Sequence, residues 1–407
     1  MTPTANGNER PEVLLLGFGG VGVIYSYILQ KGGANVTAVC RSNYETVREN
    51  GIDIFSDKFG EHRGWRPTRV ARSPEEVASI SFDYIVCCFK CVPDVKPNSE
   101  VMRPFLEMNK RNNPARLPMV VLIQNGVDIE EEAHQALVQA SDPLASCIVS
   151  AVSWIAVTLL GQGTRIEHGL MESLTVGLYP SPLDNPVPAP LAESLRTFVT
   201  LAENGGGDIL ATNDIESKRW HKIMWNISWG GVCLMSRRPV QELLQAETMP
   251  YTLGVVRGIM LEMIGIVRAS GIGEERVSVS LIDQVVGMTM SATRAKIRVR
   301  RSPDVFLERH TKSYARPDFK PSILVDLENG RPMELEPIFL NMIRRARRLG
   351  VDTPRLDLIA AAAKPIQLEL VRKQRGEDHA ALILDEEAIY DANPNENFTG
   401  CAPTLSS

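Results

Sequence analysis

The chain has 407 residues, of which 44% are hydrophobic and 23% charged, and its formal net charge is −5. These values are typical of a globular protein of two or three domains, with a core large enough to fold without disulfide or metal support. A mildly acidic chain lacks the basic surface that nucleic-acid binding favours, so we expect no nucleic-acid partner.

The chain carries no recognisable targeting or membrane segment. Residues 1–12 are polar, without the basic start and apolar stretch of a signal peptide, and we expect them to be flexible. The longest apolar runs, such as 151–160, fall short of the roughly 20 residues that a membrane span needs. The sequence therefore predicts a cytoplasmic protein with no membrane partner.

Seven cysteines are scattered through the chain, an odd number that suits a reducing compartment. Cys88 and Cys91 form a C-x-x-C pair. A zinc site would need a second pair of ligands nearby, which the sequence does not offer. A redox pair would have to lie at the start of a helix, and Pro93 disfavours a helix start at this position. We expect buried or partly buried structural thiols and no bound metal.

The N-terminal half alternates strand and helix patterns. The apolar run Val13–Leu16 leads into a glycine-rich turn, a helix over Val23–Gln30 and a second strand over Asn35–Cys40, which together fit one βαβ unit. Further strand-like segments follow at Phe82–Phe89, Met119–Ile123, Ser146–Val157 and Leu174–Leu178. This alternation predicts an α/β fold with a Rossmann-type parallel sheet.

Beyond about Thr212 the pattern changes to long helical periods. Helices are predicted over Ile215–Leu234, Tyr251–Ser270, Val277–Thr293 and Glu336–Leu349. We therefore expect a Rossmann domain over 13–211, an all-helical domain over 212–372 and a mostly disordered tail over 373–407, with one short helix around 380–390.

The glycine-rich turn has the G-x-G-x-x-G spacing of a dinucleotide-binding loop. Gly17 permits the tight turn, Gly19 lets the backbone approach a pyrophosphate, and Gly22 allows helix and strand to pack closely. The loop is completed by Phe18, Gly20 and Val21. The preceding strand and following helix make the pattern informative, although a tight turn without a ligand is the simpler alternative.

The choice of cofactor follows from the end of the second strand. An NAD site usually has an acidic residue there, whereas this chain has Arg41 followed by Ser42. A guanidinium can pair with the 2′-phosphate of NADPH, which a carboxylate would repel. The sequence thus favours NADPH, the alternative being that Arg41 is an ordinary surface arginine.

Together with later motifs, this loop resembles the ketopantoate reductase (2-dehydropantoate 2-reductase) family. The resemblance spans Val13–Gln367. It rests on G-F-G-G-V-G with Arg41, on Phe89-Lys90, on Gln124-Asn125-Gly126, on Lys222 with Asn226, and on Ser322, Asp326 and Glu334. The resemblance implies a 2-oxo acid as the substrate and NADPH as the cofactor.

The chemistry supports the roles implied for Lys222 and Asn226. Reduction of a ketone needs a hydride from a nicotinamide and a proton for the oxygen, which Lys222 can supply as general acid. Asn226, four residues on, shares a helix face with Lys222 and can orient the substrate. The alternative is that Lys222 is a helix-surface lysine like Lys218.

The resemblance implies further roles around this pair. Glu334 would bind the substrate hydroxyl or steady Lys222, although it could also be a helix-start glutamate that complements the dipole. Ser322 would cap its helix or contact the substrate carboxylate, and the two roles are compatible. Asp326 is expected to support its neighbours rather than take part in the chemistry.

Asn125 and Lys90 follow two predicted strands, at the edge of the sheet where ligands of open α/β sheets bind. By resemblance Asn125 positions cofactor and substrate, and Lys90 lies near the cofactor. A surface position is the alternative for Lys90. For His168 we expect packing at a strand edge, and His221 should point away from Lys222 on a helix.

Two features depart from the family pattern. The family often has a second asparagine one turn past Asn226, where this chain reads Trp229-Gly230-Gly231, which would reshape the pocket. The basic stretch Arg294–Lys320 is either a solvated face or a lid that attracts an anionic substrate. Three functions follow: reduction of ketopantoate in pantothenate biosynthesis, reduction of another ketone or 2-oxo acid in specialised metabolism, or NADPH-dependent regulation without turnover. The helical domain could support a homodimer.

Overall fold

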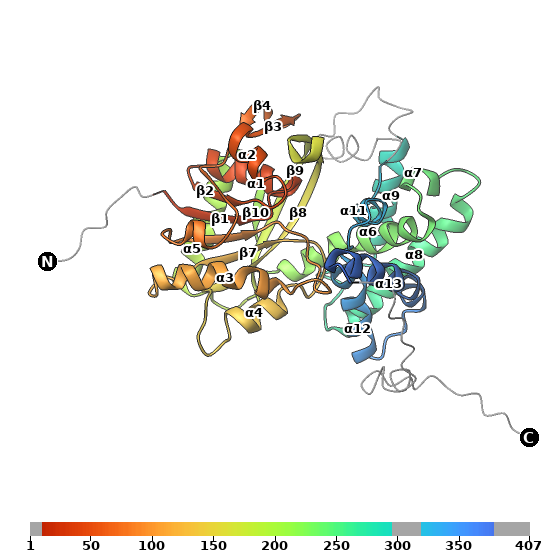
Figure 1. Ribbon diagram of the computed structural model, residues 1–407. Coiled ribbons are helices and arrows are strands. Elements are labelled where there is room, and N and C mark those ends of the chain that lie inside the picture. The colour runs from red at the N-terminus through yellow and green to blue at the C-terminus, as the bar shows by residue number, and fades with distance from the viewer. Residues whose placement is uncertain (1–9, 295–318, 378–407) are drawn as a thin grey trace, which may run out of the picture.

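The structure is a computed structural model that describes residues 10–294 and 319–377. A sheet-based part and a helical part lie side by side (Figure 1). Within these two ranges no helix is long and apolar enough to cross a membrane. The predictions for residues 1–9, for most of the basic stretch and for the tail from residue 378 fall outside the described residues.

The sheet-based part contains one mixed sheet in the order β4-β3-β9-β8-β7-β6-β1-β2-β5, with β10 paired to β9. Its strands are β1 Glu12–Leu16, β2 Asn35–Val39, β3 Ile52–Ser56, β4 Gly60–Trp65, β5 Arg69–Ala71, β6 Tyr84–Cys87, β7 Met119–Ile123, β8 Cys147–Leu160, β9 Arg165–Tyr179 and β10 Ile209–Ala211. The β3–β4 and β8–β9 pairs are antiparallel, and the other pairs are parallel. The predicted parallel-dominated α/β fold is confirmed.

Helices cover both faces of this sheet. One core includes residues of α1 (Gly20–Lys31) and α5 (Ala189–Asn204), and the other includes residues of α3 (Asn98–Asn112) and α4 (Glu131–Leu137). Successive residues of β1 alternate between these cores, which is why the strand reads as a continuous apolar run. The short helix α2 (Tyr44–Asn50) follows β2.

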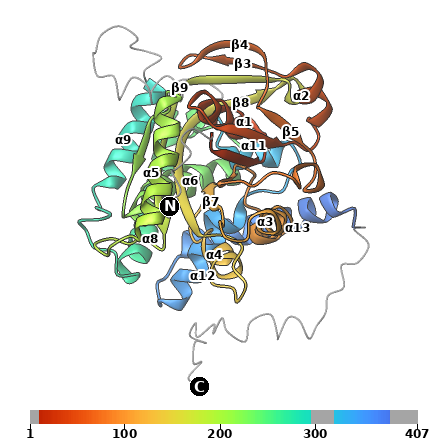
Figure 2. The same ribbon diagram turned by 90° about the vertical axis from the view of Figure 1, so that its left-hand side faces the viewer.

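The helical part is built around α6 (Ile215–Ser236), whose Trp220 and Trp229 are fully buried. The elements around it are α7 Val240–Leu243, α8 Met249–Ala269, α9 Leu281–Arg294, α11 Ser322–Glu328, the π-helical turn η4 Glu336–Leu340, α12 Asn341–Arg348 and α13 Pro354–Arg375. Lys364 and Gln367 of α13 bond to Asp94 in the loop before α3; Figure 2 looks from the side of the sheet-based part, so α3 lies in front of α13 there. The all-helical C-terminal part is confirmed.

Several elements differ from the sequence prediction. The β3–β4 hairpin was not predicted, because β4 lies at the sheet edge with no buried residue and so shows no apolar run. Strand β9 begins at Arg165, well before the predicted strand, and α9 begins at Leu281 rather than Val277. Helix α13 was also missed, and the predicted boundary at residue 372 lies inside it.

The topology gathers the predicted site residues at one edge of the sheet. Strands β7, β6, β1 and β2 are neighbours and run parallel, so their carboxyl ends lie together. Asn125 follows β7, Lys90 follows β6, the glycine loop follows β1 and Arg41 follows β2. Four separate segments of the chain therefore lie together at the carboxyl ends of the strands, where ligands of open α/β sheets bind.

Candidate active site

The glycine loop has the shape of a dinucleotide cradle. Gly17 has φ 98°, and an added Cβ there would overlap the Phe89 backbone, whereas one at Gly22 would overlap the Gly17 carbonyl. A Cβ at Gly19 would meet nothing within 4 Å, so open space lies over this residue. Helix α1 starts at Gly20 with no side-chain cap and no acidic residue in its first turn. A pyrophosphate fits such a helix start.

The end of β2 lies beside this loop. Arg41 and Ser42 are exposed, and the Asn43 amide donates a 3.1 Å hydrogen bond to the Phe18 carbonyl, which ties the two loops together. Among residues 10–294 and 319–377 Arg41 makes no ion pair, so its guanidinium is available to an anionic ligand. These features fit a dinucleotide with a phosphate on its adenosine ribose.

The buried carboxylate of Glu334 connects the sheet edge to the helical part. One oxygen accepts a 3.2 Å hydrogen bond from the Asn125 amide, and the other accepts a 3.1 Å bond from the Cys91 backbone N–H. Glu334 is 4% exposed, and burial raises the pKa of its carboxyl group despite the attraction of Lys90. The structure therefore brings Glu334 and Asn125 together, far apart though they are in sequence.

Lys222 of α6 projects toward the same edge. Its ammonium group donates a hydrogen bond to the Ser153 carbonyl of β8, and its Nζ lies 6.0 Å from the centre of the Trp154 ring. Burial, together with the nearby positive charge of Arg219, lowers the pKa of Lys222 to about 8, against the opposing attraction of Glu334. A lysine in this state is still mostly protonated at neutral pH and gives up its proton readily.

A small cavity of about 10 Å³ lies between Asn125 of the sheet edge and Lys222 with Asn226 of α6. Apolar walls are contributed by Val152 and Ile223. Three side chains expected to contact the substrate thus line one partly open cavity, as the i, i+4 spacing on α6 implies. Glu334 joins them through its bond to Asn125.

Lys90 and Ser322 lie outside this cavity. Lys90 is half-exposed and pairs with the buried carboxylate of Asp326, which also binds Arg331, so Asp326 is a supporting residue. Ser322 is exposed at the start of α11, but Pro321 occupies the N-cap and no side-chain cap bond forms. The predicted capping role of Ser322 is therefore wrong, because the helix begins one residue earlier than a serine cap requires.

Arg219 is a site residue that the sequence reasoning missed. It lines the cavity, is only 6% exposed, and pairs with the buried carboxylate of Glu130. The sequence feature that could have identified Arg219 is its position on the apolar face of α6, one turn from Ile215 and one turn from Ile223. A charged residue at such a position needs a buried partner, which α6 itself does not contain.

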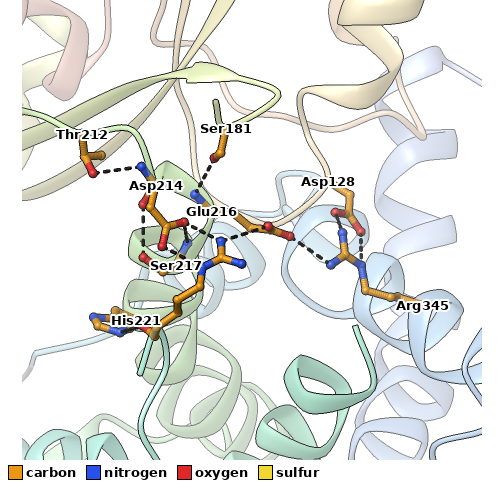
Figure 3. Close-up of polar contacts among 9 residues, drawn as sticks. Asp128, Ser181, Thr212, Asp214, Glu216, Ser217, His221 and Arg345 are labelled. Atoms are coloured by element: carbon orange, nitrogen blue, oxygen red, sulfur yellow. Dashed lines mark hydrogen bonds and ion pairs between the residues drawn. The ribbon is translucent and has the colours of Figure 1, made fainter. Parts of the chain in front are cut away.

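The start of α6 is anchored by a chain of ion pairs (Figure 3). Asp214 caps the helix by accepting a bond from the Ser217 N–H, and it pairs with Arg276 at 2.6 Å. Glu216 contacts both Arg276 and Arg345, and Arg345 also pairs with Asp128 beyond β7. These contacts hold the helix that carries Lys222 against the sheet-based part.

The histidines have structural roles. His168 is buried in β9, where its Nδ1 lies 2.8 Å from the Ser56 hydroxyl. Packing is thus confirmed, but β9 is an interior strand rather than an edge. His221 contacts the Arg276 carbonyl rather than the cavity.

The cysteine pair is also structural. Cys91 is buried and Cys88 is partly buried, as expected. Burial raises the pKa of both thiols, which makes them unreactive.

The segment Trp229–Gly231 does not line the cavity. Trp229 is fully buried in the helical core, and an added Cβ at Gly231 would lie 2.8 Å from Ile359. Gly230 is covered by Pro321 and Ile323, at ordinary contact distances from an added Cβ. The expected alteration of the pocket by Trp229 is not borne out, because this side chain belongs to the helical core and is not among the residues that line the cavity.

Comparisons with known proteins decide the family. Residues 13–181 match the family described as ketopantoate reductase PanE/ApbA, and residues 214–367 match its C-terminal domain. The chain belongs to the ketopantoate reductase family. Several of the relatives are named 2-dehydropantoate 2-reductase, which supports a keto-group oxidoreductase and the resemblance seen in the sequence.

Individual relatives cover nearly the whole chain. An uncharacterised protein of Saccharomyces cerevisiae is 28% identical over 92% of this chain and 99% of its own length. The crystal structure of 2-dehydropantoate 2-reductase from Methylococcus capsulatus has a TM-score of 0.67 and 28% identity, covering 88% of this chain and 97% of that one. D-mandelate dehydrogenase with NADH and anilino(oxo)acetate shares the fold, with a TM-score of 0.63 at 15% identity and coverage of 88% and 99%.

Proposed function

We propose that the protein reduces 2-dehydropantoate to pantoate with NADPH. The observation that carries this proposal is the cavity lined by Asn125, Lys222 and Asn226, with a lysine whose pKa is lowered to about 8. An acid of this strength suits protonation of a carbonyl oxygen near neutral pH. The name of the Methylococcus capsulatus protein supports this choice of substrate.

The chain's own residues supply the remaining parts of the reaction. When bound, NADPH supplies the hydride that reduces the carbonyl carbon. Lys222 transfers a proton from Nζ to the carbonyl oxygen and is reprotonated from solvent. Asn226 and Asn125 orient the substrate through their amides, and Glu334 accepts a bond from its hydroxyl.

Three residues outside the cavity, Arg41, Lys90 and Ser322, bind the cofactor and the substrate. Arg41 pairs with the 2′-phosphate and selects NADPH over NADH. Lys90, beside the glycine loop, attracts the cofactor phosphates, and Ser322 donates a bond to the substrate carboxylate. At about 10 Å³ the present cavity has room for about one water molecule, far less than the roughly 300 Å³ that ligand pockets usually enclose. We infer that the two parts separate to admit substrate and then close around it.

A second candidate is reduction of another ketone or 2-oxo acid. Its support is the fold shared with a D-mandelate dehydrogenase, whose bound anilino(oxo)acetate is an aryl 2-oxo acid derivative. The apolar walls Val152 and Ile223 would accept an apolar substituent.

The test is NADPH oxidation at 340 nm by the purified chain, with 2-dehydropantoate and a panel of alkyl and aryl 2-oxo acids. The highest kcat/KM with 2-dehydropantoate is the expected result. A clear preference for another 2-oxo acid would establish the second candidate. Tight NADPH binding with no turnover of any compound would contradict both and leave a regulatory role.

A further inference from the structure

A buried ion pair between Arg219 and Glu130 adjoins the cavity, which Arg219 helps to line. Arg219 of α6 and Glu130, just before α4, are 6% and 3% exposed. The Ser150 hydroxyl joins them, because it accepts a 2.8 Å bond from Arg219 Nε and donates a 2.5 Å bond to Glu130. Charges so far from water persist only when paired and hydrogen-bonded, and this pair is both.

The same guanidinium holds the loop that carries Asn125. Its Nη1 donates 2.9 Å hydrogen bonds to the carbonyls of Gln124 and Gly126, the two neighbours of Asn125 in sequence. Arg219 is also three residues before Lys222, so it lies one helical turn from the ammonium group. One side chain therefore connects the substrate-orienting amide on the sheet to the proton donor on α6.

A second network fixes the far side of this loop. The Gln124 side chain donates a 2.9 Å bond to the Phe89 carbonyl, next to Lys90, and exchanges bonds with Asn98. The ends of β6 and β7 and the first half of β8 are thereby linked to α6 through buried polar groups. Such networks specify one arrangement when every member has a partner.

We propose that Arg219, held by Glu130, is the positioning residue of this active site: it sets where Asn125 lies relative to Lys222 and supplies the positive charge that Lys222 faces. The inference rests on the proposed reductase function. Arg219 acts through these two residues rather than on the substrate.

The charges around Lys222 predict that removing Arg219 and removing Glu130 shift the pKa of Lys222 in opposite directions. Arg219 lowers the pKa of Lys222, Glu334 raises it, and Glu130 neutralises Arg219. Lys90 is compensated by Asp326, and the Ser153 carbonyl contributes only a dipole. Removing the positive charge of Arg219 should raise the pKa of Lys222, whereas removing the negative charge of Glu130 should lower it further.

The experiment compares kcat, KM and the pH dependence of kcat/KM for Arg219→Gln, Glu130→Gln and Arg219→Lys with 2-dehydropantoate. We expect the alkaline limb to move up by roughly 0.5 to 1 pH unit in Arg219→Gln and down by a similar amount in Glu130→Gln. Arg219→Lys keeps the charge, but its shorter side chain and three donors cannot replace the guanidinium contacts to Ser150 and Glu130 together with those to both carbonyls, so kcat should fall about tenfold or more while the limb stays in place.

Controls separate this role from simple destabilisation. Arg257→Gln, which breaks a surface pair with Asp283, should match the wild type in every readout. NADPH affinity and cooperative thermal unfolding establish that each variant folds. If Arg219→Gln does not fold, Glu130→Gln and Arg219→Lys still decide.

The inference would be overturned if the alkaline limb of the kcat/KM profile stayed fixed in Arg219→Gln and Glu130→Gln, or moved in the same direction in both. Full kcat in Arg219→Lys would do the same. The proposed function fails separately, if the wild-type protein oxidises NADPH with none of the 2-oxo acids.

Discussion

Asn125 and Glu334 are 209 residues apart in sequence, yet the Asn125 amide donates a 3.2 Å hydrogen bond to the Glu334 carboxylate. The bond runs from the end of β7 to the segment before η4, so it spans the junction between the sheet and the helices. Because the other carboxylate oxygen accepts the Cys91 N–H, both oxygens already have protein donors. Glu334 is therefore placed to hold Asn125 in position as well as to meet a substrate.

Glu334→Gln should lower kcat/KM by roughly 10- to 100-fold while the protein stays folded. A glutamine has one acceptor oxygen in place of two, so either the Asn125 or the Cys91 donor loses its partner. Steady-state kinetics with thermal unfolding measure this. The matched control is Glu336→Gln, two residues on, which pairs with Arg344 and Lys364 and should keep wild-type kcat/KM. Equal losses in both variants would contradict the role of Glu334.

Lys222→Ala should reduce kcat by about 100-fold or more, because the general acid is lost. NADPH affinity should change little, since Lys222 lies on α6 rather than in the glycine loop. Fluorescence titration with NADPH and turnover measurements separate the two effects. Lys218→Ala, on the same helix, is the control and should retain activity. A Lys222→Ala enzyme with the wild-type rate would remove this residue from the mechanism.

The activity should also fall as the pH rises through about 8, the lowered pKa of Lys222. The sign follows from the role, because the acid must carry its proton: the group is charged below this pKa and loses the proton above it. We expect kcat/KM to decrease about tenfold per pH unit above the limb. A flat profile up to pH 10 would show that Lys222 is not the titrating acid.

Much of this site was accessible to sequence reasoning for identifiable physical reasons. A glycine loop after a buried strand, polar residues after parallel strands, and a lysine and an asparagine four apart on a helix are local patterns with a fixed geometric consequence. Gly17, Asn125, Lys222 and Asn226 therefore lie where their patterns place them.

What escaped prediction depends on distant partners. The burial of Arg219 depends on Glu130, 89 positions earlier, and nothing local to either residue reveals the other. Helix α13 contains Pro365, which interrupts the helical pattern although the packing of the helix tolerates it. The β3–β4 hairpin forms because β3 pairs with β9, a contact that only the folded chain creates.

Because His168 is buried, the protein should lose stability in acid. Burial lowers its pKa to about 4, against about 6.5 in the unfolded chain. Below pH 6.5 protons therefore bind the unfolded state preferentially, and the free energy of unfolding should decrease by up to about 3 kcal/mol by pH 4. Urea denaturation between pH 4 and pH 8 measures this. His168→Gln should show a shallower decrease than the wild type, and an unchanged slope would contradict the assignment.

Arg41→Ala should weaken NADPH binding selectively. The exposed guanidinium lies two residues beyond β2, beside the loop that Asn43 ties to Phe18, and it has no carboxylate partner among the described residues. Only NADPH carries a 2′-phosphate, so the loss of one charge-assisted contact should raise its Kd by about tenfold or more and leave the Kd of NADH nearly unchanged.

The measurement is fluorescence titration of both cofactors against the wild type and two variants. Arg72→Ala is the matched control, because Arg72 follows the neighbouring strand β5 but is already paired with Glu45. It should leave the ratio of the two dissociation constants near its wild-type value. If Arg41→Ala weakens NADH and NADPH equally, Arg41 supports the loop rather than the phosphate, and the preference for NADPH must originate elsewhere.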